Sequence, residues 1–223
     1  MRRIILVPVL IVLALFAIAG GIAYLLYNNY TYYSTDDAQL TGNVISVNAL
    51  ASGQLTALDV TLGQNVTVGQ AIASITPAAT LSATGVPVKA KPIDITSPIN
   101  GKVIQTSAVN GQTVSAGLPL IEVADLNSIT VTAYVNEGSI NNIKVGQDVD
   151  IKVDAYSDTN FTGKVQQIIP ATASTFSLLP TQDNASGNFT KVGQRIPVVI
   201  TLDGNGGKTL APGMSATTTI HIH

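Results

Sequence analysis

The 223-residue sequence lacks cysteine and is poor in histidine and in charge. Without cysteine it can form no disulfide, thiolate metal site or cysteine nucleophile. Its two histidines, His221 and His223, leave little for an imidazole base or metal cage. Charged residues make up 11% of the chain and the net charge is −2, against about 25% charged residues in an average soluble protein. A basic face for nucleic acid is therefore absent. We expect no enzyme, no nucleic-acid partner, and no catalytic, cofactor-binding or metal-binding residues.

One long uncharged segment is present near the N-terminus. Residues 4–26 contain no charged side chain, and a helix of that length, at about 1.5 Å per residue, crosses a hydrocarbon core of about 30 Å. Arg2 and Arg3 precede the segment, and the next cationic residue is Lys89. The positive-inside rule then predicts a cytoplasmic N-terminus and an extracytoplasmic remainder. We therefore expect a single-pass cell-membrane protein whose N-terminus and anchor occupy residues 1–35.

Two features near the end of this segment bear on that prediction. Five of the seven tyrosines cluster there, as in an interfacial aromatic belt: Tyr24, Tyr27, Tyr30, Tyr32 and Tyr33. A cleaved signal peptide is the alternative, because residues 17–19 read Ala-Ile-Ala. The apolar run continues past that site to Leu26, which favours the anchor.

An internal repeat occupies the part that follows. Shifting the sequence by 48 positions, without gaps, places glycine on glycine and apolar residues on apolar residues. The aligned glycines are Gly53 with Gly101, Gly63 with Gly111, and Gly69 with Gly117. Short alternating stretches between glycine turns are a β pattern, and glycine at the same turn twice predicts the same positive φ twice. Each half is too small to bury its own apolar face, so the halves, about 45–75 and 93–123, should close into one β-sandwich.

The halves are separated by a linker at 76–92. It contains Pro77, Pro87 and Pro92 and lacks a helical period, so we expect a loop rather than a helix. Halves and linker together define a predicted domain at 36–123.

The remainder, residues 124–223, changes to longer alternating stretches. Apolar and polar residues alternate over 129–135, 149–153, 196–202 and 214–222, which indicates antiparallel strands with one buried face. Several such strands predict a small antiparallel β-barrel. A polar stretch at about 171–191 interrupts the pattern and should be a long loop. The expected fold class is thus mainly β, with an N-terminal transmembrane helix, a split sandwich and a barrel.

These features resemble a known family. The repeat pattern G-Q-x-V-x-x-G, followed by S-P-x-x-G-x-V, resembles the two halves of a biotinyl/lipoyl domain. An anchor, a split lipoyl-like domain and a barrel, in this order, resemble membrane fusion proteins of the HlyD/EmrA type. Similar motifs include T-D-D-A at 35–38, V-G-Q-D-V at 145–149, Q-R-I-P-V at 194–198 and L-A-P-G-M at 210–214. The motif positions are Asp36, Asp37, Pro98, Glu137, Gly146, Gln147, Gln194, Arg195, Pro212 and Gly213.

The resemblance implies an adaptor of a multidrug efflux or secretion complex. Such an adaptor forms a homo-oligomer around a passage and works with a polytopic transporter, for EmrA-like members one of the major-facilitator class. The chain departs from long members of the family, which carry an α-helical hairpin between the lipoyl halves. Even if fully helical, residues 76–92 would total only about 25 Å. The sequence therefore suggests a short adaptor, from a cell without an outer membrane or one that needs another part to reach further.

Three alternatives remain open. Lys89 and Lys91 flank the position where true lipoyl or biotin carriers hold their modified lysine, although we expect solvated linker lysines. His221 and His223 share a strand face and could supply half of a zinc site, but no third ligand is apparent and a polar chain end is the simpler interpretation. A cell-surface structural or ligand-binding protein could also reuse the sandwich.

Overall fold

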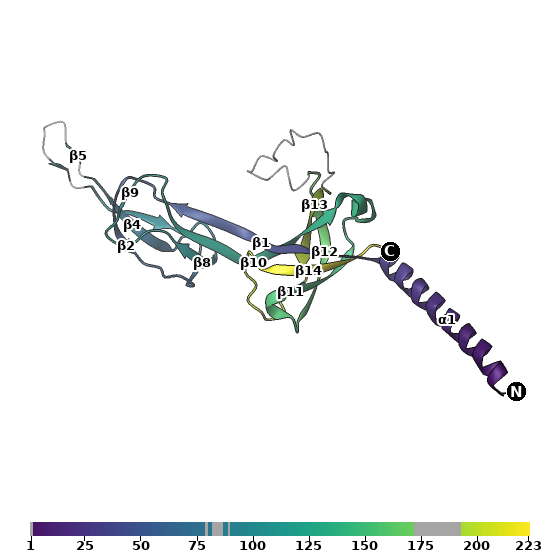
Figure 1. Cartoon of the computed structure of the whole chain (residues 1–223). Helices are drawn as coiled ribbons and strands as arrows, with labels where there is room; N and C mark the ends of the chain where they lie inside the picture. Colours follow the sequence, from purple (N-terminus) through teal and green to yellow (C-terminus); the bar gives the residue numbers. More distant parts are fainter. Residues whose placement is uncertain (1, 79, 82–86, 89, 172–192) are drawn as a thin grey trace, which may run out of the picture. The chain divides into compact units, whose positions relative to one another are not determined.

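The computed structural model describes residues 2–78, 80–81, 87–88, 90–171 and 193–223, so most of the predicted loop at 171–191 lies outside the described residues. It confirms a mainly β fold behind an apolar N-terminal helix (Figure 1). The elements are α1 (Arg2–Thr31), β1 (Tyr32–Asn48), β2 (Gly53–Leu58), β3 (Asn65–Val66), β4 (Ala71–Pro77), β5 (Thr80–Leu81), β6 (Pro87–Val88), β7 (Ile93–Thr96), β8 (Gly101–Thr106), β9 (Thr113–Val114), β10 (Pro119–Asn136), the 3₁₀ helices η1 (Glu137–Asn142) and η2 (Asp154–Tyr156), β11 (Asp148–Val153), β12 (Asn160–Ile168), β13 (Arg195–Leu202) and β14 (Ser215–His221).

Helix α1 is longer than the predicted 4–26. Hydropathy marks only the apolar part of a helix, whereas backbone hydrogen bonding continues into the polar residues beyond it. In the last turn the Thr31 hydroxyl donates to the Tyr27 carbonyl at 2.9 Å. The stretch Val12–Thr31 is long and apolar enough to cross a membrane. Its large apolar side chains are more than half exposed to their surroundings, as expected of a helix that packs against lipid.

The chain forms two compact units. The barrel unit consists of Met1–Gln39, Val131–Lys208 and Met214–His223, and the sandwich unit of Leu40–Thr130 and Thr209–Gly213. Strands β1 and β10 contribute residues to both units. The compact units divide within these strands, at 39/40 and at 130/131, and the predicted boundaries at 35/36 and 123/124 remain predictions.

The two halves of the sandwich unit are interlocked by reciprocal backbone hydrogen bonds. The Gly63 amide donates to the Val103 carbonyl at 2.8 Å, and the Gly111 amide donates to the Leu55 carbonyl at the same distance. Val103 and Leu55 donate back to the carbonyls of Gln64 and Gln112 at 2.9 Å. Each residue in one set lies 48 positions from its counterpart in the other set, which is the spacing of the repeat. The Gly69 and Gly117 turns make a second reciprocal set with Ser97 and Ala49.

These bonds surround a single apolar core drawn from both halves. The fully buried side chains include Leu55, Ile72, Ile75, Ile95, Val103, Val114, Leu120 and Val123. One half alone would leave its share of this surface exposed, at about 25 cal/mol for each Å² of apolar area. The core therefore stabilises the halves only as a pair.

Two of the three glycine pairs have the positive φ expected of them, and the third does not. Gly63 and Gly111 have φ of 82° and 86°, and Gly69 and Gly117 have 79° and 85°. The expectation was wrong for Gly53 and Gly101, which begin strands β2 and β8 in extended backbone. There, close approach requires glycine: a Cβ on Gly53 would lie 2.3 Å from the Thr76 carbonyl oxygen, and one on Gly101 2.4 Å from that of Ala124.

The described part of the linker is a short β-ribbon rather than an unpaired loop. Thr80 pairs with Val88 and Leu81 with Pro87, in an antiparallel two-stranded sheet. Strand β4 continues to Pro77, and β7 begins only at Ile93. As predicted, the residues of the linker that the structure describes include no helix.

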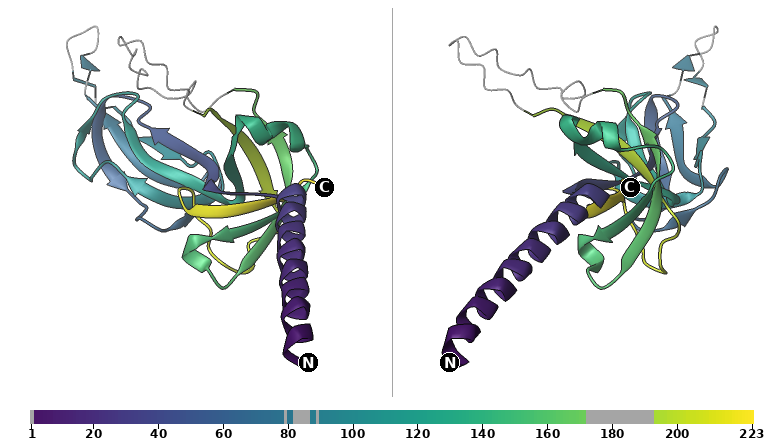
Figure 2. Two further views of the ribbon diagram at one scale, coloured as in Figure 1. Left: turned by 45° about the vertical axis from the view of Figure 1, so that its right-hand side comes forward. Right: turned by 90° about the vertical axis from the view of Figure 1, so that its right-hand side faces the viewer.

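The barrel has six strands in the order β1-β14-β11-β12-β13-β10, and pairing of β1 with β10 closes it. Both views in Figure 2 show these strands curving around a common interior. The pairs from β1 round to β13 are antiparallel, and their inward positions are apolar, among them Val149, Ile151, Phe161, Val165, Ile200 and Ile220. One polar side chain, Thr218, is fully buried with its hydroxyl unpaired among the described residues.

Candidate functional site at the membrane exit

The T-D-D-A motif forms a β-bulge in the first strand after the anchor. Thr35 of β1 pairs with Thr218 and Ala38 with Ala216, so Asp36 and Asp37 together face a single residue of β14. The Thr35 hydroxyl accepts a hydrogen bond from the Asp37 amide at 3.2 Å, which closes the bulge locally. A bulge re-aims the side chains next to it. Here Asp36 is exposed and Asp37 is half-buried.

Asp37 forms an ion pair with Arg195. The two residues belong to motifs that lie far apart in the sequence, and the barrel brings them together because β10 is the neighbour of both β1 and β13. Each side chain is still more than 40% exposed. Such an exposed pair stabilises the fold by no more than about 1 kcal/mol. Folding stability therefore gives little reason for these two residues.

Gly146 and Gln147 form a turn of the kind found in the sandwich unit. Gly146 has φ of 93° and donates its amide to the Val165 carbonyl at 2.8 Å. The Gln147 side chain accepts from the Lys144 amide at 2.8 Å. It also donates to the carbonyls of Asn142 and Ile222, at 3.1 and 3.3 Å. Gln64, Gln70 and Gln112 close their turns with the same side-chain bond.

The other motif positions have backbone roles. Glu137 begins η1 and donates its amide to the Gln194 carbonyl at 3.0 Å, while its side chain is exposed. Pro98 is exposed, after the buried Ser97, whose hydroxyl donates to the Ile99 carbonyl at 2.8 Å. In the sandwich unit, Gly213 has a positive φ and donates to the Leu40 carbonyl at 2.8 Å. Pro212 packs beside Gly42, where a Cβ would lie 2.9 Å from the proline ring.

The end of α1 is tied to the end of β14. The Ile222 amide donates to the Thr31 carbonyl at 2.9 Å, and the rings of Tyr30 and His223 stack with centroids 4.2 Å apart. Both views in Figure 2 place the C-terminus beside this end of the helix. His221 makes two further contacts: its ring stands edge-on to Tyr32 at 4.9 Å, and its Nε2 lies 2.7 Å from a carboxylate oxygen of Asp150. The two histidines thus belong to a joint between the helix and the barrel.

The contacts of His221 and His223 bear on the zinc alternative. Within the described ranges, no three histidine, aspartate or glutamate side chains come close enough together to hold a metal ion. The ring of His223 faces Tyr30, while His221 faces Asp150. The two side chains therefore make different contacts, and the expected shared strand face is not found, because β14 ends at His221 and His223 lies beyond it.

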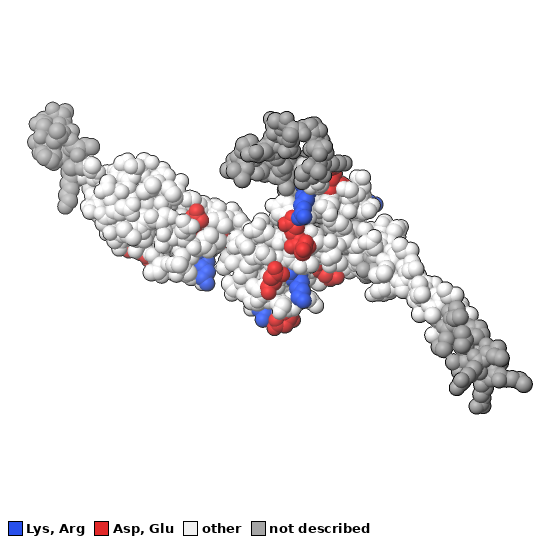
Figure 3. Space-filling model, in the orientation of Figure 1, with Lys and Arg blue, Asp and Glu red and all other residues white. Residues whose placement is uncertain are grey.

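Charged side chains gather on the outside of the barrel, whereas the face of the sandwich unit seen in Figure 3 carries few. Asp148 on β11 and Lys164 on β12 are opposite each other in register and form an ion pair. The hydrogen bond from Lys164 lowers the pKa of the Asp148 carboxyl, and the same bond raises the pKa of Lys164. In the sandwich unit, the hydroxyl of Ser128 is the main cause of a lowered pKa at Asp125.

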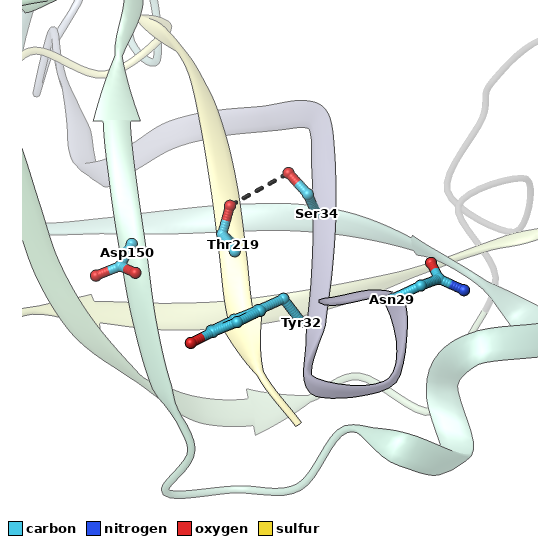
Figure 4. A pocket seen from close by; sticks show the side chains of 5 residues that line it. All are labelled: Asn29, Tyr32, Ser34, Asp150 and Thr219. Atoms are coloured by element: carbon cyan, nitrogen blue, oxygen red, sulfur yellow. Dashed lines mark hydrogen bonds between the residues drawn. The ribbon is translucent and has the colours of Figure 1, made fainter. Parts of the chain in front are cut away.

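A hollow that the sequence did not predict lies on the outside of the barrel, next to the joint between α1 and the end of β14. It has a volume of about 590 Å³ and is lined by Asn29, Tyr32, Ser34, Asp150 and Thr219 (Figure 4). The lining comes from the consecutive elements α1 and β1 and from β11 and β14, which lie at least 100 residues further along the chain. Alternation marks Asp150 and Thr219 as outward-facing, but only the strand order β1-β14-β11 brings them beside Ser34.

Comparison with known protein families matches both units. The model of the barrel-sandwich hybrid domain of RND membrane fusion proteins matches residues 43–125, and that of the YknX-like β-barrel domain matches 129–220. The efflux system component YhbJ of Bacillus subtilis, itself described as putative, is 35% identical over 218 residues, covering 98% of this chain and 92% of YhbJ. The colistin resistance protein EmrA of Acinetobacter baumannii is 42% identical over 129 residues, 57% of this chain but only 36% of that protein. The multidrug export protein EmrA of Escherichia coli is 43% identical over 49% of this chain and 28% of its own length.

Solved structures share the fold. The periplasmic adaptor protein EmrA superposes with a TM-score of 0.54 at 13% identity, covering 86% of this chain and 98% of that structure. The membrane fusion protein Spr0693 of Streptococcus pneumoniae R6 superposes with a TM-score of 0.57 at 19% identity, covering 85% and 97%. With a sandwich and a barrel that both match and a relative similar over nearly its whole length, the chain belongs to the membrane fusion protein family of efflux components, non-enzymatic adaptors anchored in the cell membrane.

Proposed function

We propose that this chain is the adaptor subunit of a multidrug efflux or secretion complex, works with a polytopic transporter of the major-facilitator class, and is not itself an enzyme. Helix α1 is its single span, with the N-terminus in the cytoplasm and both β units outside. Several copies surround a passage for the substrate. The observation that carries this proposal is the similarity of the chain to EmrA proteins named for multidrug export and colistin resistance.

The family motifs support the proposal because several of them lie on the barrel surface near the anchor. Asp36 is exposed in the bulge of β1, and Asp37 pairs with Arg195 at a site open to solvent. An exposed pair contributes little to folding, so we assign these side chains to contacts with the transporter or with a neighbouring subunit. The repeat glycines and Gly146, Gln147, Pro98, Pro212 and Gly213 have structural roles in the proposal. The sandwich and barrel domains are taken at 36–123 and 124–223.

The short linker sets the reach of the proposed adaptor. Fifteen residues separate β4 from β7, and an extended ribbon of that length, at about 3.3 Å per residue, rises at most about 25 Å. We therefore propose that this adaptor acts close to its own membrane, or through a further component. A covalent-cofactor role is not part of the proposal: Lys91 is exposed, and Lys89 lies outside the described residues.

Purification of the tagged full chain from its native membrane tests the partner. We expect a polytopic transporter of the major-facilitator class to co-purify, and deletion of the chain to raise the accumulation of a fluorescent efflux substrate in the cells. Restoring the wild-type chain should reverse that accumulation, whereas a chain that lacks residues 2–31 should not.

Recovery of no polytopic transporter, together with unchanged accumulation, would contradict the proposal and favour a structural or ligand-binding protein of the cell surface. Mass spectrometry of the intact chain provides a separate test of the carrier alternative, because biotin or lipoate on a lysine would add its mass.

A further inference from the structure

The hollow beside the end of α1 has a defined floor. Ser34 on β1 pairs with Thr219 on β14, which pairs in turn with Asp150 on β11, so the three side chains form one row on the outer face of the barrel. The Ser34 and Thr219 hydroxyls are hydrogen-bonded to each other at 3.2 Å. Figure 4 shows these two short side chains joined to each other among the other side chains that line the hollow. Each hydroxyl oxygen keeps lone pairs that can accept a further hydrogen bond.

The walls are held in place by His221. Tyr32 is the register partner of His221, and the two rings form a T-shaped pair. The Nε2 of the same imidazole lies 2.7 Å from a carboxylate oxygen of Asp150. The ring of Tyr32 and the carboxylate of Asp150 are thus both positioned from one residue. Asp150 is 60% exposed, and its second oxygen has no partner among the residues that the structure describes. A preorganised wall lowers the cost of ordering side chains when a ligand binds.

The chemistry of the lining fits a small cation that carries N–H donors. It offers a carboxylate, two hydroxyl oxygens and the ring of a tyrosine, and a cation is attracted by both a carboxylate and a ring face. Helix α1 beyond Arg3 and strand β1 supply no lysine or arginine to the hollow, and the imidazole of His221 contacts one of the two carboxylate oxygens of Asp150. Lys164 is already paired with Asp148. Lys152, two positions along β11 from Asp150 on the same face, is the nearest competing cation in the sequence.

The position of the hollow selects the source of that cation. Asn29 lies in the last turn of α1, and Tyr32 is the first residue after the helix. Tyr24, Tyr27 and Tyr30 are each more than 60% exposed on that last part of the helix, and exposed tyrosines mark the headgroup level of a bilayer. With α1 in the membrane, the hollow faces the headgroups directly.

We propose that the hollow binds the primary ammonium group of an aminophospholipid such as phosphatidylethanolamine. The ammonium donates to Asp150 and to the hydroxyl pair of Ser34 and Thr219, and rests against Tyr32. A choline headgroup cannot make these bonds, because its quaternary nitrogen has no hydrogen to donate. The inference rests on the proposed membrane span, and it requires neither a transporter nor an oligomer.

Lipid retention by the full chain tests the proposal. The protein is purified in detergent, given an equimolar mixture of phosphatidylethanolamine and phosphatidylcholine with identical acyl chains, and analysed by native mass spectrometry. Wild-type protein should retain the ethanolamine lipid about fivefold over the choline lipid, the size expected of one exposed charged contact. Asp150→Asn should abolish the preference, and N-methylation of the headgroup should reduce it stepwise.

Two further variants make the test specific to the hollow. Asp158→Asn removes the same charge beyond the other end of β11 and should leave the preference unchanged, while Lys152→Gln removes a competing cation and should raise it. Thermal melts of each variant verify that the fold is retained. Equal retention of both lipids by the wild type, or equal effects of Asp150→Asn and Asp158→Asn, would overturn the proposal.

The same preparation distinguishes a lipid from a free amine. If the site binds the headgroup as part of a lipid, millimolar free ethanolamine should displace little of the bound lipid. If free ethanolamine displaces all of it and binds as tightly as the lipid, the lipid assignment is wrong. Failure of the transporter to co-purify would contradict the proposed function and leave this result intact.

Discussion

Substitution of the turn glycines distinguishes two reasons for which a protein needs glycine. Gly63 and Gly111 have φ of 82° and 86°, and a Cβ on either would meet no heavy atom within 4 Å. The cost of a side chain there is therefore conformational, about 1–2 kcal/mol for an ordinary residue in the left-handed region. Alanine recovers about 0.4–1 kcal/mol of this through the unfolded state. Valine, which is β-branched, should cost about 1–3 kcal/mol at both positions.

Gly53 should respond in a different way, because its backbone is extended. A Cβ there would lie 2.3 Å from the Thr76 carbonyl oxygen and 2.7 Å from the Pro77 Cα, and backbone atoms of a paired strand cannot rotate aside. Gly53→Ala should thus cost about 1–3 kcal/mol through overpacking, more than Gly63→Ala. Asparagine tolerates a positive φ, so Gly63→Asn should be milder than Gly63→Val, whereas Gly53→Asn should be at least as severe as Gly53→Ala.

Urea unfolding of residues 32–223, followed by far-ultraviolet circular dichroism, measures these differences. Gly63→Val and Gly111→Val should lower the unfolding free energy by similar amounts, since the turns are equivalent in the repeat. Negligible effects of both would refute the interlocked sandwich. Equal costs for asparagine and valine at position 63 would show that the positive φ is not the reason for glycine.

Three further predictions concern orientation, the linker and pH. Protease added to intact spheroplasts should digest residues 36–223 and spare the anchor; protection of this region would reverse the proposed orientation. Replacing Ala78–Val88 with a Gly/Ser linker of equal length should leave the melting temperature nearly unchanged, because the reciprocal bonds between the halves lie elsewhere, and loss of folding would show that the linker packs into the core. Lys164 lowers the pKa of Asp148 below its unfolded value, so their pair stabilises the fold above about pH 4 and this contribution is lost as the pH falls further. Asp148→Asn should therefore flatten the acid limb of a plot of melting temperature against pH, and an unchanged limb would assign that limb to other carboxylates.

The turns and the core of the sandwich could be predicted from the sequence, because the same local pattern of glycines and apolar residues occurs twice. Glycine spacing located the turns, and the apolar positions between them proved to be the core. It could not separate a positive φ at Gly63 from a close approach at Gly53, since both demand glycine and only the partner strand tells them apart. In the barrel it missed β12, where Gly163 stands at a buried position between Phe161 and Val165 and weakens the apolar alternation.

The surface at the membrane exit was harder to predict from the sequence. Asp37 and Arg195 were identified only as separate motif positions, and nothing local indicates that they pair. His221 was predicted to be polar and outward-facing, but its neighbours Tyr32 and Asp150 follow from the order of strands from three distant parts of the chain. Pairing between such strands depends on the closure of the barrel, which alternation along a single strand does not encode.

Strand β1 begins directly after α1 and supplies residues to the barrel and then to the sandwich. A force applied to the anchor would therefore pass along β1, first to the barrel and then to the sandwich. A pull along β1 would load its antiparallel pairing with β14 in shear, so the hydrogen bonds between Tyr32 and Gln39 and their partners would have to fail together rather than one at a time. A force on the anchor would therefore reach the barrel and the sandwich through β1 without first separating its paired strands.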